Sequence, residues 1–143
     1  MKRAEIAGWV VNVDVERTRA TYAAIAKGGW ETCSCLYCRN FGAVVLESFP
    51  ADVLTFFAVA GIDALKDAEV YKFGESSPGM HSYGGEYYFW GNIEKESVGE
   101  LSGKPKFQVT FCNPSPLVQA EFSEKGAICF LFSAELPWVL EST

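Results

Sequence analysis

Ala127-Ile128-Cys129-Phe130-Leu131-Phe132 is apolar at every position. A short run of this kind, bounded by turn residues, is typical of a strand that is covered on both faces. The stretch therefore predicts an interior strand of a sheet. It decides the fold class, because such a strand needs neighbouring strands at its edges and further chain against its faces.

The residues after Gly61 alternate with the period of two that strands show. The expected strands are 69–73, 86–93, 107–112 and, more weakly, 118–122. Turn-forming segments separate them: a loop at 74–79, a bulge or tight turn at Gly84-Gly85, a turn at 99–105 and a hairpin-type connection at 123–126. A further half-buried strand is expected near the start of the chain, at 8–14.

Three stretches carry helical patterns. The first runs from Arg17 to Ala26 and ends before Gly28-Gly29. The second has apolar positions Tyr37, Phe41, Val44 and Val45 at helical spacing, with Ser34 as the expected N-cap. The third covers about 51–60, between Pro50 and Gly61.

These elements predict an α+β fold: a single, mainly antiparallel sheet of five or six strands with two central helices packed on one face. Residues 1–143 are expected to form a single domain, since the chain has no long linker and no internal repeat. Residues 136–140, Leu-Pro-Trp-Val-Leu, are expected to pack back onto that domain.

The net charge of the chain disfavours two classes of ligand. The net charge is −6 and the sequence pI is about 4.8, which disfavours nucleic acid and anionic membrane surfaces as ligands. The sequence shows neither a signal peptide nor an apolar stretch of membrane-spanning length. We therefore expect a cytoplasmic, reducing setting, in which the five cysteines are thiols or metal ligands.

Three cysteines lie within six residues, at Cys33, Cys35 and Cys38, and they form the candidate site. One interpretation is a metal site, with zinc as the ion, because thiolates at this spacing on a first helical turn can share one ion. The pattern does not supply a fourth ligand. The candidates for it are His81, which is expected in the loop before the second strand, and the two remaining cysteines, Cys112 and Cys129.

Two other interpretations stay open. Cys35 and Cys38 resemble a redox pair at a helix N-terminus, with Cys35 as nucleophile, although no strand is expected directly before them. Alternatively, the cysteines are small buried side chains of the core. The aromatic side chains of Tyr83, Tyr87, Tyr88 and Trp90 are expected in the core rather than on a ligand-binding surface.

Three motifs resemble those of a family of small bacterial proteins that share a domain of unknown function. The motifs are Cys33-x-Cys35-x-x-Cys38-x-Asn40-Phe41, Tyr83-Gly84-Gly85-x-Tyr87-x-Phe89-x-Gly91 and Leu136-Pro137-Trp138-Val139-Leu140. The resemblance implies a bacterial, intracellular, single-domain protein and assigns no catalytic residues. The function expected is a binding or structural module, with self-association through an edge strand or the aromatic hairpin. The alternative is a thiol-dependent redox protein or enzyme.

Overall fold

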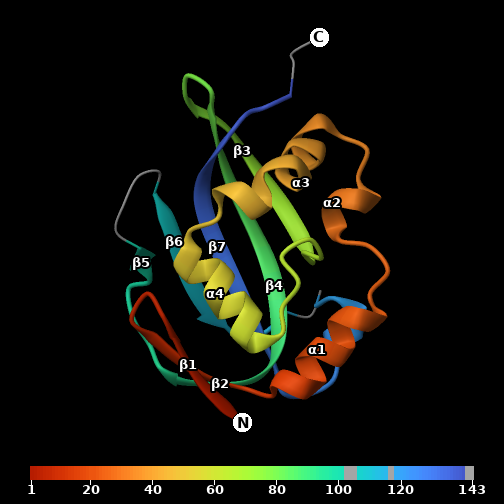
Figure 1. Ribbon diagram of the computed structural model, residues 1–143, viewed down its shortest axis with the longest axis vertical. Coiled ribbons are helices and arrows are strands. Elements are labelled where there is room, and N and C mark those ends of the chain that lie inside the picture. Colours follow the sequence, from red (N-terminus) through yellow and green to blue (C-terminus); the bar gives the residue numbers. More distant parts are fainter. Residues whose placement is uncertain (102–105, 116–117, 141–143) are drawn as a thin grey trace.

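The computed structural model describes residues 1–101, 106–115 and 118–140. Its centre is one antiparallel sheet of seven strands, with α3 and α4 lying across one face (Figure 1). The strands are β1 (Lys2–Ile6), β2 (Trp9–Val13), β3 (Glu69–Ser77), β4 (Met80–Lys95), β5 (Glu100–Leu101), β6 (Phe107–Cys112) and β7 (Ala127–Pro137).

The sheet is organised around β4, which is 16 residues long. β7 pairs with one edge of β4 along most of its length. The other edge of β4 is shared, because β3 pairs with its first half and β2 with its last residues. The strand order is β1-β2-β4-β7-β6-β5. β3 is not on this path, because it pairs with the same edge of β4 as β2 does.

The described residues form four helices, three of which follow from local signals in the sequence, whereas the single turn at 29–32 was not expected. They are α1 (Val15–Ala24), the single turn α2 (Gly29–Thr32), α3 (Leu36–Ser48) and α4 (Ala51–Ala60). Asp14 caps α1 by accepting a hydrogen bond from the backbone N–H of Arg17 at 3.1 Å. Gly61 ends α4 in the left-handed conformation, at φ +84°. Phe49-Pro50 forms the corner between α3 and α4, which meet at 93°.

The main core lies between the sheet and the two central helices. Phe41 of α3 stacks on Phe132 of β7, and Phe56 of α4 stacks on Phe130 of the same strand. Burial of such large aromatic side chains is the main driving force for folding, with about 25 cal/mol gained per Å² of apolar surface removed from water.

The opposite face of the sheet is covered in part. Phe122 packs against Tyr88 and Trp90 there, with ring centroids 5.8 and 5.2 Å apart. In β7, residues 127–130 are buried and Leu131 is half-buried. The expectation of an interior strand at 127–132 is therefore confirmed.

Several details of the expected fold are wrong. The sheet has seven strands instead of five or six, since β1 and β5 were not expected. The expected loop at 74–79 is mostly strand, and β4 continues through Gly84-Gly85 without a turn. Residues 120–122 form a 3-10 turn instead of a strand. Within the expected turn at 99–105, residues 102–105 lie outside the described residues.

No single helix in the described ranges is both long and apolar enough to cross a membrane. α3 and α4 reach that length and composition only when they are taken together across their 93° bend.

Candidate metal centre

The three clustered cysteines lie where α2 ends and α3 begins. Cys33 follows the last residue of α2, Cys35 is the N-cap of α3, and Cys38 lies in the first turn of α3. Their sulfur atoms all lie within 4.8 Å of one another. The Cys33 thiol donates a hydrogen bond to the Cys35 sulfur at 3.2 Å. The structure therefore brings together all three predicted ligands.

The N-cap differs from the one expected. Ser34 was predicted to cap α3, but the Cys35 sulfur accepts the backbone N–H of Cys38 at 3.4 Å instead. This hydrogen bond, together with the one from the Cys33 thiol, lowers the pKa of Cys35 to about 7. Burial and the hydrogen bonds with the other two thiols raise the pKa of Cys38. Cys35 is thus deprotonated more easily than Cys38.

The three cysteines differ in their solvent exposure. Cys33 and Cys35 are exposed and Cys38 is half-buried. The interpretation of the cluster as core side chains is therefore wrong for Cys33 and Cys35. Within the group that the three residues form, Cys35 is the exposed member, Cys33 is intermediate and Cys38 is buried.

Trp30 anchors the chain just before the cluster. Its indole N–H donates to the carbonyl of Leu65 at 2.9 Å, and its backbone N–H donates to Oδ1 of Asp67 at 3.2 Å. The Trp30 ring lies over Gly42 of α3, where a Cβ atom would come within 2.3 Å of a ring carbon. Trp30 thereby holds α2 against α3, and with it the position of Cys33.

Asp67 is nearly fully buried, at 1% exposure. Its Oδ2 atom has no hydrogen-bond partner among the described residues. Burial raises the pKa of Asp67 to about 6, against the hydrogen bond from the Trp30 backbone N–H, which lowers it. The backbone just before the cluster is therefore held by the carboxyl group of Asp67, whose pKa is about 6.

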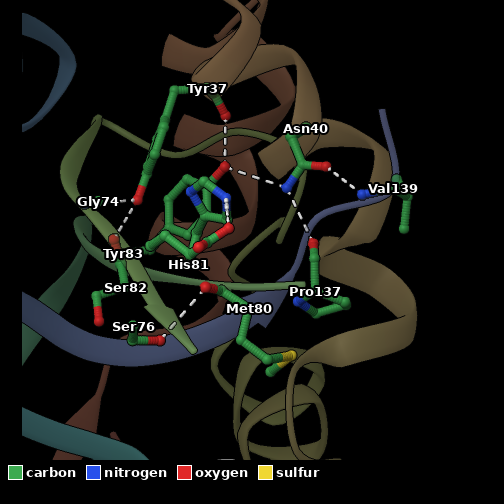
Figure 2. Close-up of polar contacts among 11 residues, drawn as sticks. Tyr37, Asn40, Gly74, Ser76, Met80, His81, Ser82, Tyr83, Pro137 and Val139 are labelled. Atoms are coloured by element: carbon green, nitrogen blue, oxygen red, sulfur yellow. Dashed lines mark hydrogen bonds and ion pairs between the residues drawn. The ribbon is translucent and has the colours of Figure 1, made fainter. Parts of the chain in front are cut away.

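Tyr37, which lies between Cys35 and Cys38, and Asn40, which follows the cluster, anchor the start of α3. Figure 2 shows the Asn40 side chain between α3 and the end of β7. Its amide donates to the carbonyl of Pro137 at 3.0 Å, and its oxygen accepts the backbone N–H of Val139 at 2.8 Å. The hydroxyl of Tyr83 donates to the carbonyl of Tyr37 at 2.7 Å. The expectation that 136–140 pack back onto the fold is confirmed by these contacts for residues 137–139.

His81 lies elsewhere than expected and is not grouped with the cysteines. It belongs to β4 instead of a loop, and its side chain is 18% exposed. The imidazole stacks on Trp138, with ring centroids 4.5 Å apart. It also meets the ring of Tyr37 edge-on, with ring centroids 5.6 Å apart, and Figure 2 shows these two side chains near each other. Its Nε2 faces a Glu75 carboxylate oxygen at 3.9 Å. His81 is thus part of an aromatic cluster beside α3.

Cys112 and Cys129 do not join the cluster either. They lie directly opposite each other on β6 and β7, whereas the group of neighbouring sulfurs consists of Cys33, Cys35 and Cys38. Among the described residues, no His, Cys, Asp or Glu completes that group as a fourth member. The donor set therefore fits a thiophilic ion and is one ligand short of the usual structural zinc site.

Sequence reasoning missed the residues that hold the cluster in place. Asn40 lies three positions after Tyr37 and next to Phe41, so a polar residue beside a predicted apolar helix face was the available signal. Trp30 and Asp67 had no signal, because their contact joins segments 37 residues apart. The aromatic prediction is confirmed: Tyr83, Tyr87, Tyr88 and Trp90 are at most 3% exposed.

No family model matches the chain, and neither a curated protein nor a solved structure matches it. The resemblance to a bacterial family through the three motifs therefore stays a prediction.

Proposed function

We propose that the protein is a metal-binding module in which the thiolates of Cys33, Cys35 and Cys38 bind one zinc ion. The observation that carries the proposal is the mutual approach of the three sulfur atoms to within 4.8 Å. Zinc–sulfur bonds of about 2.3 Å in a tetrahedral site separate the sulfurs by roughly 3.8 Å. The Cys33–Cys35 separation of 3.2 Å is on the short side of that value, so small side-chain rotations suffice to accept the ion.

The ion would cross-link two elements of the structure, α2 and α3. Cys33 follows α2, whereas Cys38 belongs to the first turn of α3. Coordination replaces weak thiol hydrogen bonds by metal–sulfur bonds and joins α2 to α3. Free thiolates persist in a reducing compartment, so the cytoplasm is the setting that suits this role.

Metal analysis of anaerobically purified full-length protein tests the proposal. We expect one zinc per chain, with three thiols that react with a disulfide reagent only after a chelator is added. Cys38→Ser should abolish stoichiometric zinc, because two thiolates remain. Cys112→Ser is the matched control and should keep it, since Cys112 lies on β6. A metal-free protein in which Cys33, Cys35 and Cys38 react without a chelator would refute the proposal.

A second candidate function is thiol–disulfide exchange by Cys35 and Cys38. Cys35 is exposed and its sulfur accepts two hydrogen bonds, while Cys38 is half-buried behind it. In this reaction the Cys35 thiolate attacks a disulfide RSSR and releases one thiolate RS⁻. The Cys38 thiolate then displaces the second RS⁻, and the two released thiolates take up the two protons from Cys35 and Cys38. The protein pair is oxidised and the disulfide is reduced.

Alkylation kinetics separate the two functions. A redox pair predicts a single fast thiol in the metal-free protein, lost in Cys35→Ser, and a rate that rises with pH around 7. It also predicts an internal disulfide after treatment with a small disulfide, seen as a loss of two titratable thiols. A protein that takes up zinc but forms no Cys35–Cys38 disulfide would eliminate this second function.

A further inference from the structure

The cysteine cluster is an incomplete coordination site. A structural zinc ion takes four ligands, and the described chain brings three sulfurs together. The remaining candidates from the sequence are engaged elsewhere: His81 stacks on Trp138, and Cys112 pairs in register with Cys129. A fourth protein ligand would therefore come from outside the described part of this chain.

The cluster also lies on a surface that another molecule can approach. Cys33 and Cys35 are exposed, and the next residue, Leu36, exposes 45% of its surface although it is apolar. The stretch from Thr32 to Cys38 carries no charged residue, whereas the whole chain has a net charge of −6. Two copies of the chain can meet at this stretch without bringing any charged side chains together other than the coordinated thiolates.

We infer that a second copy of this chain completes the site, so that zinc binding and dimerisation are one event. The two clusters face each other across a two-fold axis, as in most homodimers. Each ion keeps the three thiolates of its own chain and takes its fourth bond from a thiolate of the other copy. This inference rests on the proposed function, because it concerns the same ion.

Cys35 is the residue assigned to bridge the two ions. Within the group of three, Cys35 is the exposed member, whereas Cys33 is intermediate and Cys38 is buried. Two Zn²⁺ ions and six thiolates give the paired site a charge of −2, and the six thiol protons pass to solvent. Leu36 follows Cys35 directly and would be covered by its counterpart in the other copy.

Sedimentation of the full chain with and without zinc tests the inference. Metal-free, reduced protein is expected to be a monomer. One equivalent of zinc per chain is expected to convert it to a dimer, and a chelator should return it to the monomer. Because dimerisation follows mass action, the dimer fraction should rise with protein concentration at fixed zinc-to-chain ratio.

A matched pair of variants tests the contact between the two copies while leaving the three cysteines unchanged. Leu36→Glu retains all three cysteines but places like charges across the two-fold axis and beside the negatively charged paired site, so we expect dimerisation and zinc affinity to weaken together by at least about tenfold. Leu46→Glu is the control, because Leu46 is similarly exposed but lies near the other end of α3. It should dimerise like the original chain.

The outcomes distinguish this inference from the proposed function. A zinc-loaded monomer at every concentration would overturn the inference and leave the metal-binding function intact. A dimer that survives chelation, or a dimer with half a zinc per chain, would also overturn it. Failure to bind zinc at all would instead reject the proposed function on which it rests.

Discussion

The hydroxyl of Tyr22 makes both hydrogen bonds that a neighbouring strand would make to Tyr88. It donates to the Tyr88 carbonyl at 2.7 Å and accepts the Tyr88 backbone N–H at 3.1 Å. Along this edge of β4, pairing with β3 ends at Glu86 and pairing with β2 begins at Gly91. A side chain of α1 therefore fills the gap between two strands that share one edge.

Tyr22→Phe should destabilise the protein by about 2 kcal/mol or more, because it leaves a buried N–H and a buried carbonyl without a partner. Chemical denaturation measures this loss. Tyr71→Phe is the control: its hydroxyl donates to the Glu86 carboxylate in a part-buried position, so it should cost under about 1 kcal/mol. Equal losses for the two variants would contradict the role given to Tyr22.

Asn40→Ala should release the C-terminal segment from α3. Asn40 is fully buried and binds both Pro137 and Val139, and its loss orphans an N–H and a carbonyl at a cost of about 2 kcal/mol. Hydrogen exchange should show faster exchange of the Val139 amide than in the original chain. Arg39→Ala, at an exposed neighbouring position, should leave that amide unchanged.

Gly42→Ala should weaken zinc binding by the cysteine cluster, although Gly42 is not a ligand. The added methyl group would lie 2.3 Å from a ring carbon of Trp30. Trp30 must therefore move, and α2 loses its packing contact with α3. We expect a loss of about 1–3 kcal/mol in stability and weaker zinc binding, since Cys33 follows α2 directly. Both effects should shrink in a Trp30→Leu background, where the ring is absent. Equal zinc affinity for Gly42→Ala and the original chain would show that α2 does not position Cys33.

Asp67 should make stability depend on pH in a defined direction. Burial raises its pKa from 3.8 to about 6 in the folded state, so the native protein binds this proton more tightly than the unfolded chain. The free energy of unfolding should therefore fall by about 2–3 kcal/mol as the pH rises from 4 to 6, and this contribution stays constant above that range. Asp67→Asn should remove this slope in denaturation curves measured at several pH values. A slope unchanged by the substitution would assign it to another group.

Local sequence patterns predicted three of the four helices and, in whole or in part, five of the seven strands. Pro50 and Gly61 bound α4, and the spacing of Tyr37, Phe41 and Val44 indicated the core-facing side of α3. These signals work because helix ends and helix faces depend on residues a few positions apart. The same is true of β6, whose alternate residues are buried.

Long-range pairing decided the elements that local patterns got wrong. Residues 74–77 and 80–83 are strand because β3 and β4 pair with each other and β7 pairs with the far edge of β4. Gly84 and Gly85 allow this, since a Cβ atom at these positions would meet the rings of Phe73 and Phe132, respectively. Residues 118–122 alternate like a strand, but Phe122 instead packs from a 3-10 turn onto Trp90.

For the candidate site, the sequence by itself determined which atoms are present: three thiols at Cys33, Cys35 and Cys38, placed at the start of a helix. Only the tertiary structure decided their surroundings. It left Cys33 and Cys35 exposed, placed His81 against Trp138 on β4, and paired Cys112 with Cys129 on other strands. The physical reason is that spacing along the chain controls contacts within one helical turn, whereas sheet register controls which distant side chains can reach the same point.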